Sequence, residues 1–280
     1  MGEVRVQSTA IRFEAKPAGH AYCADFYKSA FLWLCNCEAV GSDDAYVGWS
    51  ITCFLTLKEL IMPLALYGHP FSSYTQKVLI ALYENGTPFE FRSLGPDTPQ
   101  HAAEWLQRWP LRKFPLLLDG ERSVVETSII IEYLQLEHAG PLHLLPADAR
   151  AALDVRFLDR FFDLHVMSPV QHAVGAALTG NAEKAQEGRA HAAEKLELAY
   201  AWIEGQLAGK TWAAGEHFTM ADCAAAPSLF YADWTHPIAG SYPLLRAYRA
   251  RLLARPSFAR AVEEARPYRP LFPLGAPDRD

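Results

Sequence analysis

The most informative part of the chain is a short apolar run, a polar turn and a helical stripe between Leu64 and Gly86. Leu64 to Tyr67 predicts a strand, and the turn at Gly68 to Ser73 holds glycine, histidine, proline and two serines. Apolar side chains then recur close to the spacing of one helix face, at Val78, Leu79, Ala81, Leu82 and Tyr83. The turn thus places two hydroxyls at a helix start, where free N–H groups and the helix dipole favour negative charge.

The next 50 residues continue this alternation of strands and helices. Strands are predicted at Phe89 to Ser93, Leu116 to Leu118 and Ser123 to Glu126, with Asp119-Gly120 as the hairpin turn. Short helices are predicted at 100–107 and from Thr127 or Ser128 onwards. This pattern predicts a small α/β domain over residues 62–140.

A connection rich in glycine and proline, Ala139 to Asp148, is the best candidate domain boundary. Every later periodic segment is helical. We expect helices at 149–178, 183–207, 219–234, 244–255 and 258–266, which together predict an all-helical domain over residues 149–270. The proline-rich tail after Pro267 is expected to run over the surface as an irregular segment.

Composition and charge exclude several classes of protein. Of the 280 residues, 50% are hydrophobic and 21% charged, which is typical of a globular chain with ample core material. The formal net charge of −6 argues against a nucleic-acid partner, which would require a basic face. No run of 18 apolar residues is present, so we expect no membrane-spanning helix.

The first 61 residues differ from the rest. They hold four of the five cysteines, and their apolar clusters lack clean periodicity. No metal site is expected, because Cys35 and Cys37 are too close together and no paired histidines complete a zinc set. We interpret residues 1–61 as an extension, with Met62 as the natural start, a hypothesis that the intact mass of the native product would test. The remaining chain is expected to be reduced and cytoplasmic.

Four motifs in the right order give residues 62–266 a resemblance to a known family. They are the serine turn PFSSYTQKV, the Pro-x-x-Lys-x-Pro pattern from Pro110 to Pro115, VETSIIIEYL, and FTMADCAAAP from Phe218 to Pro227. Together they resemble the cytosolic glutathione transferases, with a turn similar to that of the zeta, tau and phi classes. The resemblance implies a thioredoxin-like α/β domain followed by an all-α helical bundle, glutathione as co-substrate, and a homodimer.

The two serines of the turn receive different roles. Aligned with the family motif, Ser72 takes the position of the hydroxyl that stabilises the glutathione thiolate. Ser73 and Gln76 form an S-x-x-Q pattern, which predicts that Ser73 is mainly a helix cap. Ser73 is also expected to be part of the glutathione site. Tyr67 is the rival for thiol activation, since other classes use a tyrosine at the end of the first strand. The absence of cysteine in this turn disfavours dithiol and mixed-disulfide chemistry.

The other two motifs of the first domain supply residues that would hold glutathione. The resemblance implies that Pro115 is cis and that the backbone of Phe114 pairs with the cysteinyl unit. Lys113 would meet the glycine carboxylate, or is simply a solvated cation. Glu126 would accept the γ-glutamyl ammonium, and Thr127, in place of the usual serine, would bind the γ-glutamyl carboxylate or only cap the helix.

The helical domain supplies structural residues and a substrate wall. Thr219 and Asp222 predict a capping box on a buried helix, and Cys223 a small buried side chain. Six residues are candidates for an apolar pocket that holds the electrophile or for bundle core: Phe161, Phe162, His165, Met167, Tyr231 and Trp234. We predict a transferase that delivers glutathione thiolate to a hydrophobic electrophile. Alternatives are a non-catalytic ligand carrier or interaction module, and a glutathione-dependent isomerase or peroxidase.

Overall fold

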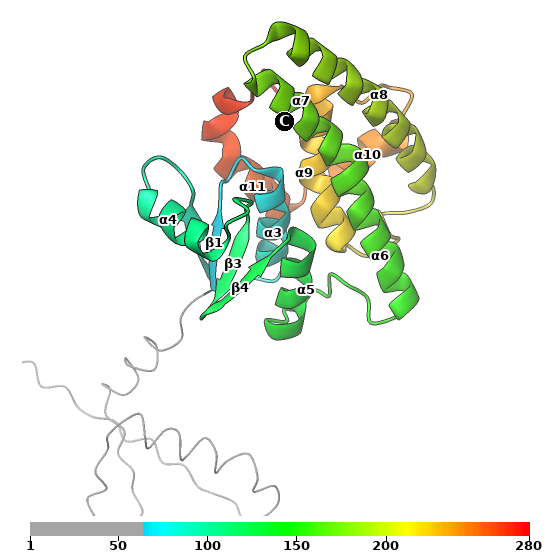
Figure 1. The fold of residues 1–280 in the computed structure, drawn as a ribbon. Coiled ribbons are helices and arrows are strands. Elements are labelled where there is room, and N and C mark those ends of the chain that lie inside the picture. The colour runs from blue at the N-terminus through cyan, green and yellow to red at the C-terminus, as the bar shows by residue number, and fades with distance from the viewer. Residues whose placement is uncertain (1–63) are drawn as a thin grey trace, which may run out of the picture. The chain divides into compact units, whose positions relative to one another are not determined.

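A computed structural model describes residues 64–280, so the interpretation of residues 1–61 lies outside the described residues. The described part begins with a four-stranded sheet in the order β2-β1-β3-β4 (Figure 1). Its strands are β1 (Leu64–Gly68), β2 (Phe89–Ser93), β3 (Leu116–Asp119) and β4 (Arg122–Val125). β1 runs parallel to β2 and antiparallel to β3, and β4 pairs antiparallel with β3. All four predicted strands are present, with ends shifted by one residue at most.

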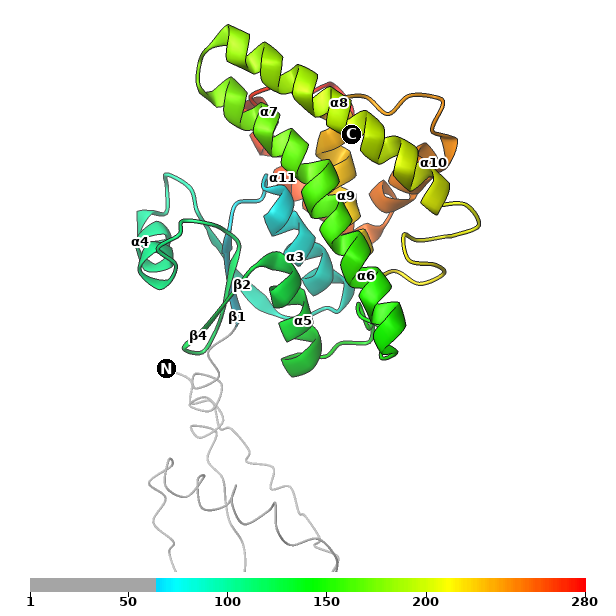
Figure 2. The same ribbon diagram turned by 45° about the vertical axis from the view of Figure 1, so that its right-hand side comes forward.

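Helices cover both faces of this sheet (Figure 2). One face packs against α3 (Ser73–Glu84) and α5 (Thr127–Glu137), and the other against α4 (Pro99–Arg108). Successive side chains of a strand point to opposite faces, so Leu64 and Leu66 lie under α3 and α5. Ala65 and Tyr67 face the α4 side instead. The expected α/β thioredoxin-like arrangement is confirmed.

The rest of the described chain is helical, as predicted. It comprises α6 (Ala149–Phe161), the π-helical η1 (Phe162–Met167), α7 (Ser168–Leu178), α8 (Ala182–Gln206), α9 (Met220–Thr235), α10 (Pro243–Leu253), α11 (Pro256–Ala265) and the 3₁₀ segment η2 (Arg266–Leu271). The long helix expected at 149–178 is therefore interrupted by η1. Pro169 supplies no N–H to the helical ladder there, and the Ser168 hydroxyl donates to the Asp163 carbonyl at 3.0 Å.

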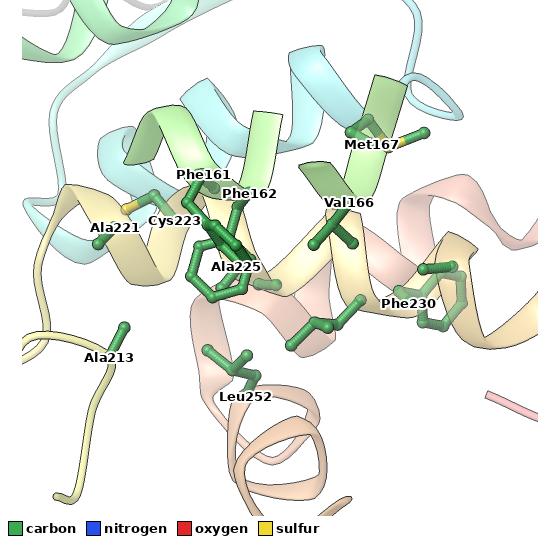
Figure 3. Close-up of a cluster of buried hydrophobic side chains, with 14 of the residues drawn as sticks. Phe161, Phe162, Val166, Met167, Ala213, Ala221, Cys223, Ala225, Phe230 and Leu252 are labelled. Atoms are coloured by element: carbon green, nitrogen blue, oxygen red, sulfur yellow. The ribbon is translucent and has the colours of Figure 1, made fainter. Parts of the chain in front are cut away.

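All residues of α9 from Met220 to Trp234 are buried, which makes this helix the centre of the helical core. Figure 3 shows part of that core, with Ala221, Cys223, Ala225 and Phe230 of α9 labelled. The predicted capping box at its start is confirmed, because the Asp222 carboxylate accepts from the Thr219 N–H at 2.8 Å. Asp222 also accepts from the Ala213 N–H and the Tyr248 hydroxyl, at 2.9 and 2.6 Å. Cys223 is fully buried, as expected for a small apolar side chain.

α3 connects the sheet to the helical bundle. Val78, Leu79 and Leu82 pack in the sheet core, whereas Ile80 and Ala81 belong to the core of the helical part. A helix that is apolar on all sides is buried between two layers. The serine turn at the start of α3 is consequently held between the sheet and the bundle.

The C-terminal tail differs from its prediction as an irregular surface segment. Phe272 and Leu274 are buried in the helical core, and Phe272 packs against Phe71 and Tyr231 of the serine turn and α9. Arg279 forms an ion pair with Asp233 of α9 that ties down the end of the tail. The prediction failed because proline-rich composition indicates irregular backbone but does not indicate whether the side chains are buried.

Candidate active site

The serine turn is held by a dense set of short-range hydrogen bonds. The Ser72 N–H donates to the His69 carbonyl at 2.9 Å, and the Phe71 N–H donates to the His69 ring nitrogen Nδ1 at 3.2 Å. Gly68 is required before this turn, because a Cβ there would lie 2.7 Å from the Thr75 side chain. From the bundle, the Tyr231 hydroxyl donates to the Phe71 carbonyl at 2.9 Å. The turn is therefore held by its own hydrogen bonds and by α9.

The helix cap predicted at Ser73 is formed by Ser72 instead. Ser72 is the N-cap of α3, with extended backbone angles, and its Oγ accepts from the Thr75 N–H at 3.3 Å. Ser73 is the first helical residue, and its buried hydroxyl has no hydrogen-bond partner among the described residues. The Gln76 amide donates to the Pro70 carbonyl and does not complete a capping box. The prediction was wrong because the helix begins one residue earlier than the S-x-x-Q pattern suggested.

Two cavities meet beside this turn. The first, of about 270 Å³, we call the polar cavity, and the residues that line it include Glu126, Thr127, Arg160 and Asp163. The second, of about 420 Å³, we call the apolar cavity, and the residues that line it include Phe71, Ser72, Ser73, Met167, Val170, Val174 and Phe272. Tyr74, Lys113 and Phe114 line both cavities. The junction between the cavities is therefore next to the start of α3.

The loop before β3 supplies one wall of this junction. The Phe114–Pro115 peptide bond is cis, as the resemblance implied. The backbone of Phe114 makes no hydrogen bond to another residue of the described chain, and its side chain is partly exposed. An extended peptide can pair with such a backbone as an added strand. The Trp105 indole N–H donates to the Lys113 carbonyl at 3.0 Å, and the Lys113 ammonium forms no ion pair among residues 64–280.

The start of α5 supplies the opposite wall. Glu126 precedes the helix with φ of 68°, in the left-handed region that non-glycine residues rarely adopt. Its carbonyl accepts from the Ile130 N–H at 2.8 Å, so α5 begins directly after it. Thr127 is the first helical residue and is buried. This geometry brings a carboxylate, a hydroxyl and free helical N–H groups to the polar cavity, where they suit an amino acid end.

Two charged residues of the polar cavity, Arg160 and Asp163, were missed by the sequence analysis. Arg160 lies 3.2 Å from the Asp163 carboxylate, which also accepts from the ammonium of Lys77 at 2.9 Å. Lys77 is fully buried and pairs with Asp159 at 2.6 Å, and the Ser128 hydroxyl donates to that same carboxylate. The charges of this network are balanced, as buried charges require. Lys77, a cation inside the otherwise apolar stripe of α3, was the sequence signal that could have revealed this ion-pair network.

Tyr67, the rival thiol activator, lies on the other side of the sheet. It is fully buried beneath α4, and its hydroxyl accepts from Arg92. Burial raises the pKa of Tyr67, which keeps the phenol neutral. Tyr67 lines none of the cavities described for this structure.

The six residues expected to line one electrophile pocket lie in three different places in the structure. Met167 and Tyr231 line the apolar cavity. Phe161 of α6 and His165 of η1 instead line a separate cavity of about 380 Å³ together with side chains of α8. Phe162 and Trp234 lie in the helical core and line none of these cavities (Figure 3 shows Phe162). Aromatic side chains on neighbouring helical positions face different directions, and sequence spacing alone did not separate pocket from core.

Tyr74 is a further residue of the site that the sequence analysis did not select. It lines both cavities directly after the two serines. Burial raises the pKa of Tyr74 to about 12, with the Asp163 carboxylate adding to the shift. At neutral pH the phenol is therefore protonated and can donate a hydrogen bond where the cavities meet.

The described chain thus combines a thioredoxin-like sheet, an α-helical bundle and two adjoining cavities beside the start of α3. Residues 66–142 match the family model for the N-terminal domain of glutathione S-transferase, and residues 161–256 match the model for its C-terminal domain. The chain is 31% identical over 208 residues to glutathione S-transferase 3 of Zea mays, covering 71% of this chain and 93% of that protein. The chain belongs to the glutathione S-transferase family, and the predicted enzyme class is confirmed.

Two further similarities agree with this assignment. A probable maleylacetoacetate isomerase of Vibrio cholerae is 29% identical over 221 residues, which cover 74% of this chain and 99% of that protein. A glutathione transferase homolog from Drosophila mojavensis, solved with bound glutathione, superposes with a TM-score of 0.63 at 22% identity, covering 74% of this chain and 94% of that one. This structural likeness supports the fold.

Two features are absent from residues 64–280, the part of the chain that the structure describes. No helix in this range is long and apolar enough to cross a membrane. In the same range, no group of three or more histidine, cysteine or acidic side chains is arranged to hold a metal ion.

Proposed function

We propose that this glutathione S-transferase activates the thiol of glutathione with the hydroxyl of Ser72 and directs it at a hydrophobic electrophile in the apolar cavity. The observation that carries the proposal is the position of Ser72 at the N-cap of α3, on the wall of that cavity. Its oxygen accepts from the Thr75 N–H, so its hydrogen is free to donate to sulfur. One serine then both caps the helix and stabilises the thiolate.

The energetic demand on this site is modest. A free thiol has a pKa of about 8.5, so only a few per cent is thiolate at neutral pH. Lowering that pKa by two units requires a preference for the anion of about 2.7 kcal/mol. A hydroxyl hydrogen bond and the N-terminus of α3 together supply free energy of this order. Tyr67, beneath α4, then has a structural role.

The polar cavity would hold the peptide part of glutathione. The backbone of Phe114, next to Pro115, pairs with the cysteinyl unit, and Lys113 meets the glycine carboxylate. Glu126 accepts the γ-glutamyl ammonium, while Thr127 and Arg160 bind the γ-glutamyl carboxylate. Ser73 and Tyr74 lie between this subsite and the apolar cavity, beside the expected place of the sulfur.

The functional unit we propose is a cytoplasmic homodimer. Its interface includes the α6–α8 face, which we define as Phe157, Leu164, Leu198 and Trp202. The first three of these side chains are 50–65% exposed, and Phe157 packs its ring against Trp202 at 5.7 Å between centroids. Dimerisation is typical of the family, and an exposed apolar face of this kind is a common partner-binding surface.

Retention on a glutathione matrix followed by a conjugation assay tests the proposal. We expect binding and turnover of an apolar electrophile, and loss of turnover in Ser72→Ala with binding retained. Binding without turnover across several electrophile classes would instead favour a ligand carrier. Absence of both would contradict every glutathione-dependent function considered for this chain.

A further inference from the structure

The apolar cavity has an uneven distribution of charge. Its walls are hydrophobic side chains from the serine turn, α7 and the C-terminal tail. Its charged lining consists of two adjacent cations, Arg112 and Lys113, and none of the described residues that line it is acidic. In a protein with a formal net charge of −6, this is a locally cationic wall on an otherwise anionic molecule.

Neither cation is used to hold the fold together. Within residues 64–280, the side chains of Arg112 and Lys113 make no ion pair and no hydrogen bond to protein groups. Both residues are exposed, so each charge is available to a ligand in the cavity. By contrast, Arg108 in the preceding helix is paired with Glu104 at 3.3 Å.

The backbone at Arg112 adds an independent observation. Arg112 has φ of 56°, in the left-handed region, and its N–H closes a turn with the Trp109 carbonyl at 3.1 Å. Glycine adopts this conformation without steric cost, whereas a side chain with a Cβ is disfavoured there. A strained conformation of a charged residue on a cavity wall points to a use for its side chain.

The two cations differ in the cavities that they reach. Lys113 lines both the polar and the apolar cavity, so it is available to glutathione. Arg112 lines the apolar cavity and is absent from the lining of the polar one. We infer that the electrophile of this enzyme is an apolar molecule that carries a carboxylate, and that Arg112 binds this carboxylate as a specificity-determining residue.

This inference rests on the proposed transferase function and adds the class of the second substrate. A guanidinium can hold a carboxylate through two parallel N–H···O bonds, while the apolar walls hold the rest of the molecule. A cavity of about 420 Å³ is large enough for a substituted aromatic ring. The carboxylate at Arg112 would then orient the reactive carbon relative to the sulfur near Ser72.

A matched pair of electrophiles, 4-isothiocyanatobenzoate and its methyl ester, isolates the effect of the carboxylate. In both reactions the glutathione sulfur bonds to the isothiocyanate carbon, and the π electron pair of the C=N bond moves to nitrogen. Nitrogen takes the proton that the thiol loses, and no group leaves. We propose to measure kcat/KM for both compounds, at saturating glutathione, in the full-length protein.

The variants are Arg112→Gln, Arg112→Gly and Arg150→Gln. Arg112→Gly suits the left-handed backbone and so keeps the loop folded. Arg150→Gln is the matched control, because Arg150 is an exposed arginine at the start of α6 that lines none of the cavities. Both Arg112 variants should lower kcat/KM for the acid about 5- to 20-fold while changing that for the ester less than about 2-fold. The wild-type preference for the acid should also fall as ionic strength rises.

The possible outcomes separate this inference from the proposed function. Turnover of both compounds with an acid-to-ester ratio unchanged in the Arg112 variants would overturn the carboxylate assignment and leave the transferase function standing. An equal loss for acid and ester would also overturn it, since Arg112 would then serve glutathione or the loop. Absence of turnover with either compound in the wild-type enzyme would overturn both proposals. A ratio that falls in the Arg112 variants but not in Arg150→Gln supports the inference.

Discussion

At the scale of single residues, the most important observation is that the hydroxyl that caps α3 also lies on the wall of the apolar cavity. Ser72 accepts the Thr75 N–H with its oxygen and retains a hydrogen to donate. Ser73, one position later, is buried without a partner, although the sequence pattern had assigned the cap to it. A shift of one residue in the start of a helix is enough to exchange these environments.

Replacement of Ser72 by alanine should therefore affect both activity and stability. We expect the pKa of bound glutathione to rise towards about 8.5, with kcat/KM falling about 10- to 100-fold as the preference for the thiolate is lost. Loss of the cap should also cost about 1 kcal/mol of unfolding free energy. Ultraviolet titration of the thiolate in the binary complex and urea unfolding measure the two effects.

Two matched variants separate these effects. Ser72→Thr keeps a hydroxyl that can both cap and donate, so most activity and stability should remain. Ser73→Ala removes a buried hydroxyl without a partner and should leave the unfolding free energy nearly unchanged. An unaltered thiol pKa in Ser72→Ala would contradict the role of Ser72.

At the scale of elements, the structure is held by polar contacts between helices that the sequence does not pair. The Arg156 guanidinium of α6 donates to the Glu132 carboxylate of α5 at 2.7 and 2.8 Å, which joins the α/β part to the bundle. Asp222 of α9 joins its own helix to the loop at Ala213 and to Tyr248 of α10. The Glu132–Arg156 pair predicts a dependence of stability on pH, and the Asp222 contacts predict a large loss of stability on substitution.

The Glu132–Arg156 pair should make stability depend on pH in the acidic range. Hydrogen bonds from Arg156 lower the pKa of Glu132 below its usual 4.5. Because the folded pKa is lower than the unfolded one, the stabilisation is complete above about pH 4.5 and is lost as the pH falls through the folded pKa. Since the pair is partly exposed, we expect about 0.5 kcal/mol at neutral pH.

Urea unfolding of wild type and Glu132→Gln at several pH values tests this prediction. The difference in unfolding free energy should shrink towards zero as the pH falls through the lowered pKa of Glu132 in the folded protein. Glu137→Gln, at the end of the same helix and without an ion pair among residues 64–280, is the control and should show no such trend. A difference that stays constant with pH would contradict the assignment.

Replacement of Asp222 by alanine should be much more damaging. It leaves the Thr219 and Ala213 N–H groups and the Tyr248 hydroxyl without their acceptor in a fully buried site. Each unsatisfied buried donor costs about 1–3 kcal/mol, so we expect a loss of about 3 kcal/mol or more. Thermal unfolding measures this loss of unfolding free energy. Asp154→Ala, at an exposed position of α6, is the control. An unchanged midpoint in Asp222→Ala would refute the structural role.

At the scale of the whole molecule, the bundle presents an apolar surface that the described chain does not cover. The α6–α8 face carries Leu198 at 65% exposure, beside the cavity lined by Phe161 and His165. A homodimer through this face would remove this surface from water. Phe161 and His165, two of the six residues expected in the electrophile pocket, would then lie at this interface.

Introducing a charge on this face should weaken the proposed dimer. We expect Leu198→Glu to raise the dimer dissociation constant at least about tenfold, equivalent to about 1.4 kcal/mol, because a carboxylate would have to be desolvated at the interface. Sedimentation velocity over a range of protein concentrations gives the constant. Leu111→Glu, at an exposed leucine of the loop before β3, should leave it unchanged. Equal behaviour of both variants would exclude this face.

The sequence by itself determined the order and type of the elements, because short apolar runs bounded by turn residues and helical periodicity at Val78, Leu79 and Leu82 are local properties. It also located the motifs at Ser72, Pro115 and Glu126-Thr127, since these are contiguous. The tertiary structure decided which side chains meet: Lys77 with Asp159 and Asp163, Phe272 with the serine turn, and Arg112 with the apolar cavity. These contacts bring together parts that are far apart in the chain, and the local sequence around a charged or aromatic residue does not indicate which partner it will contact.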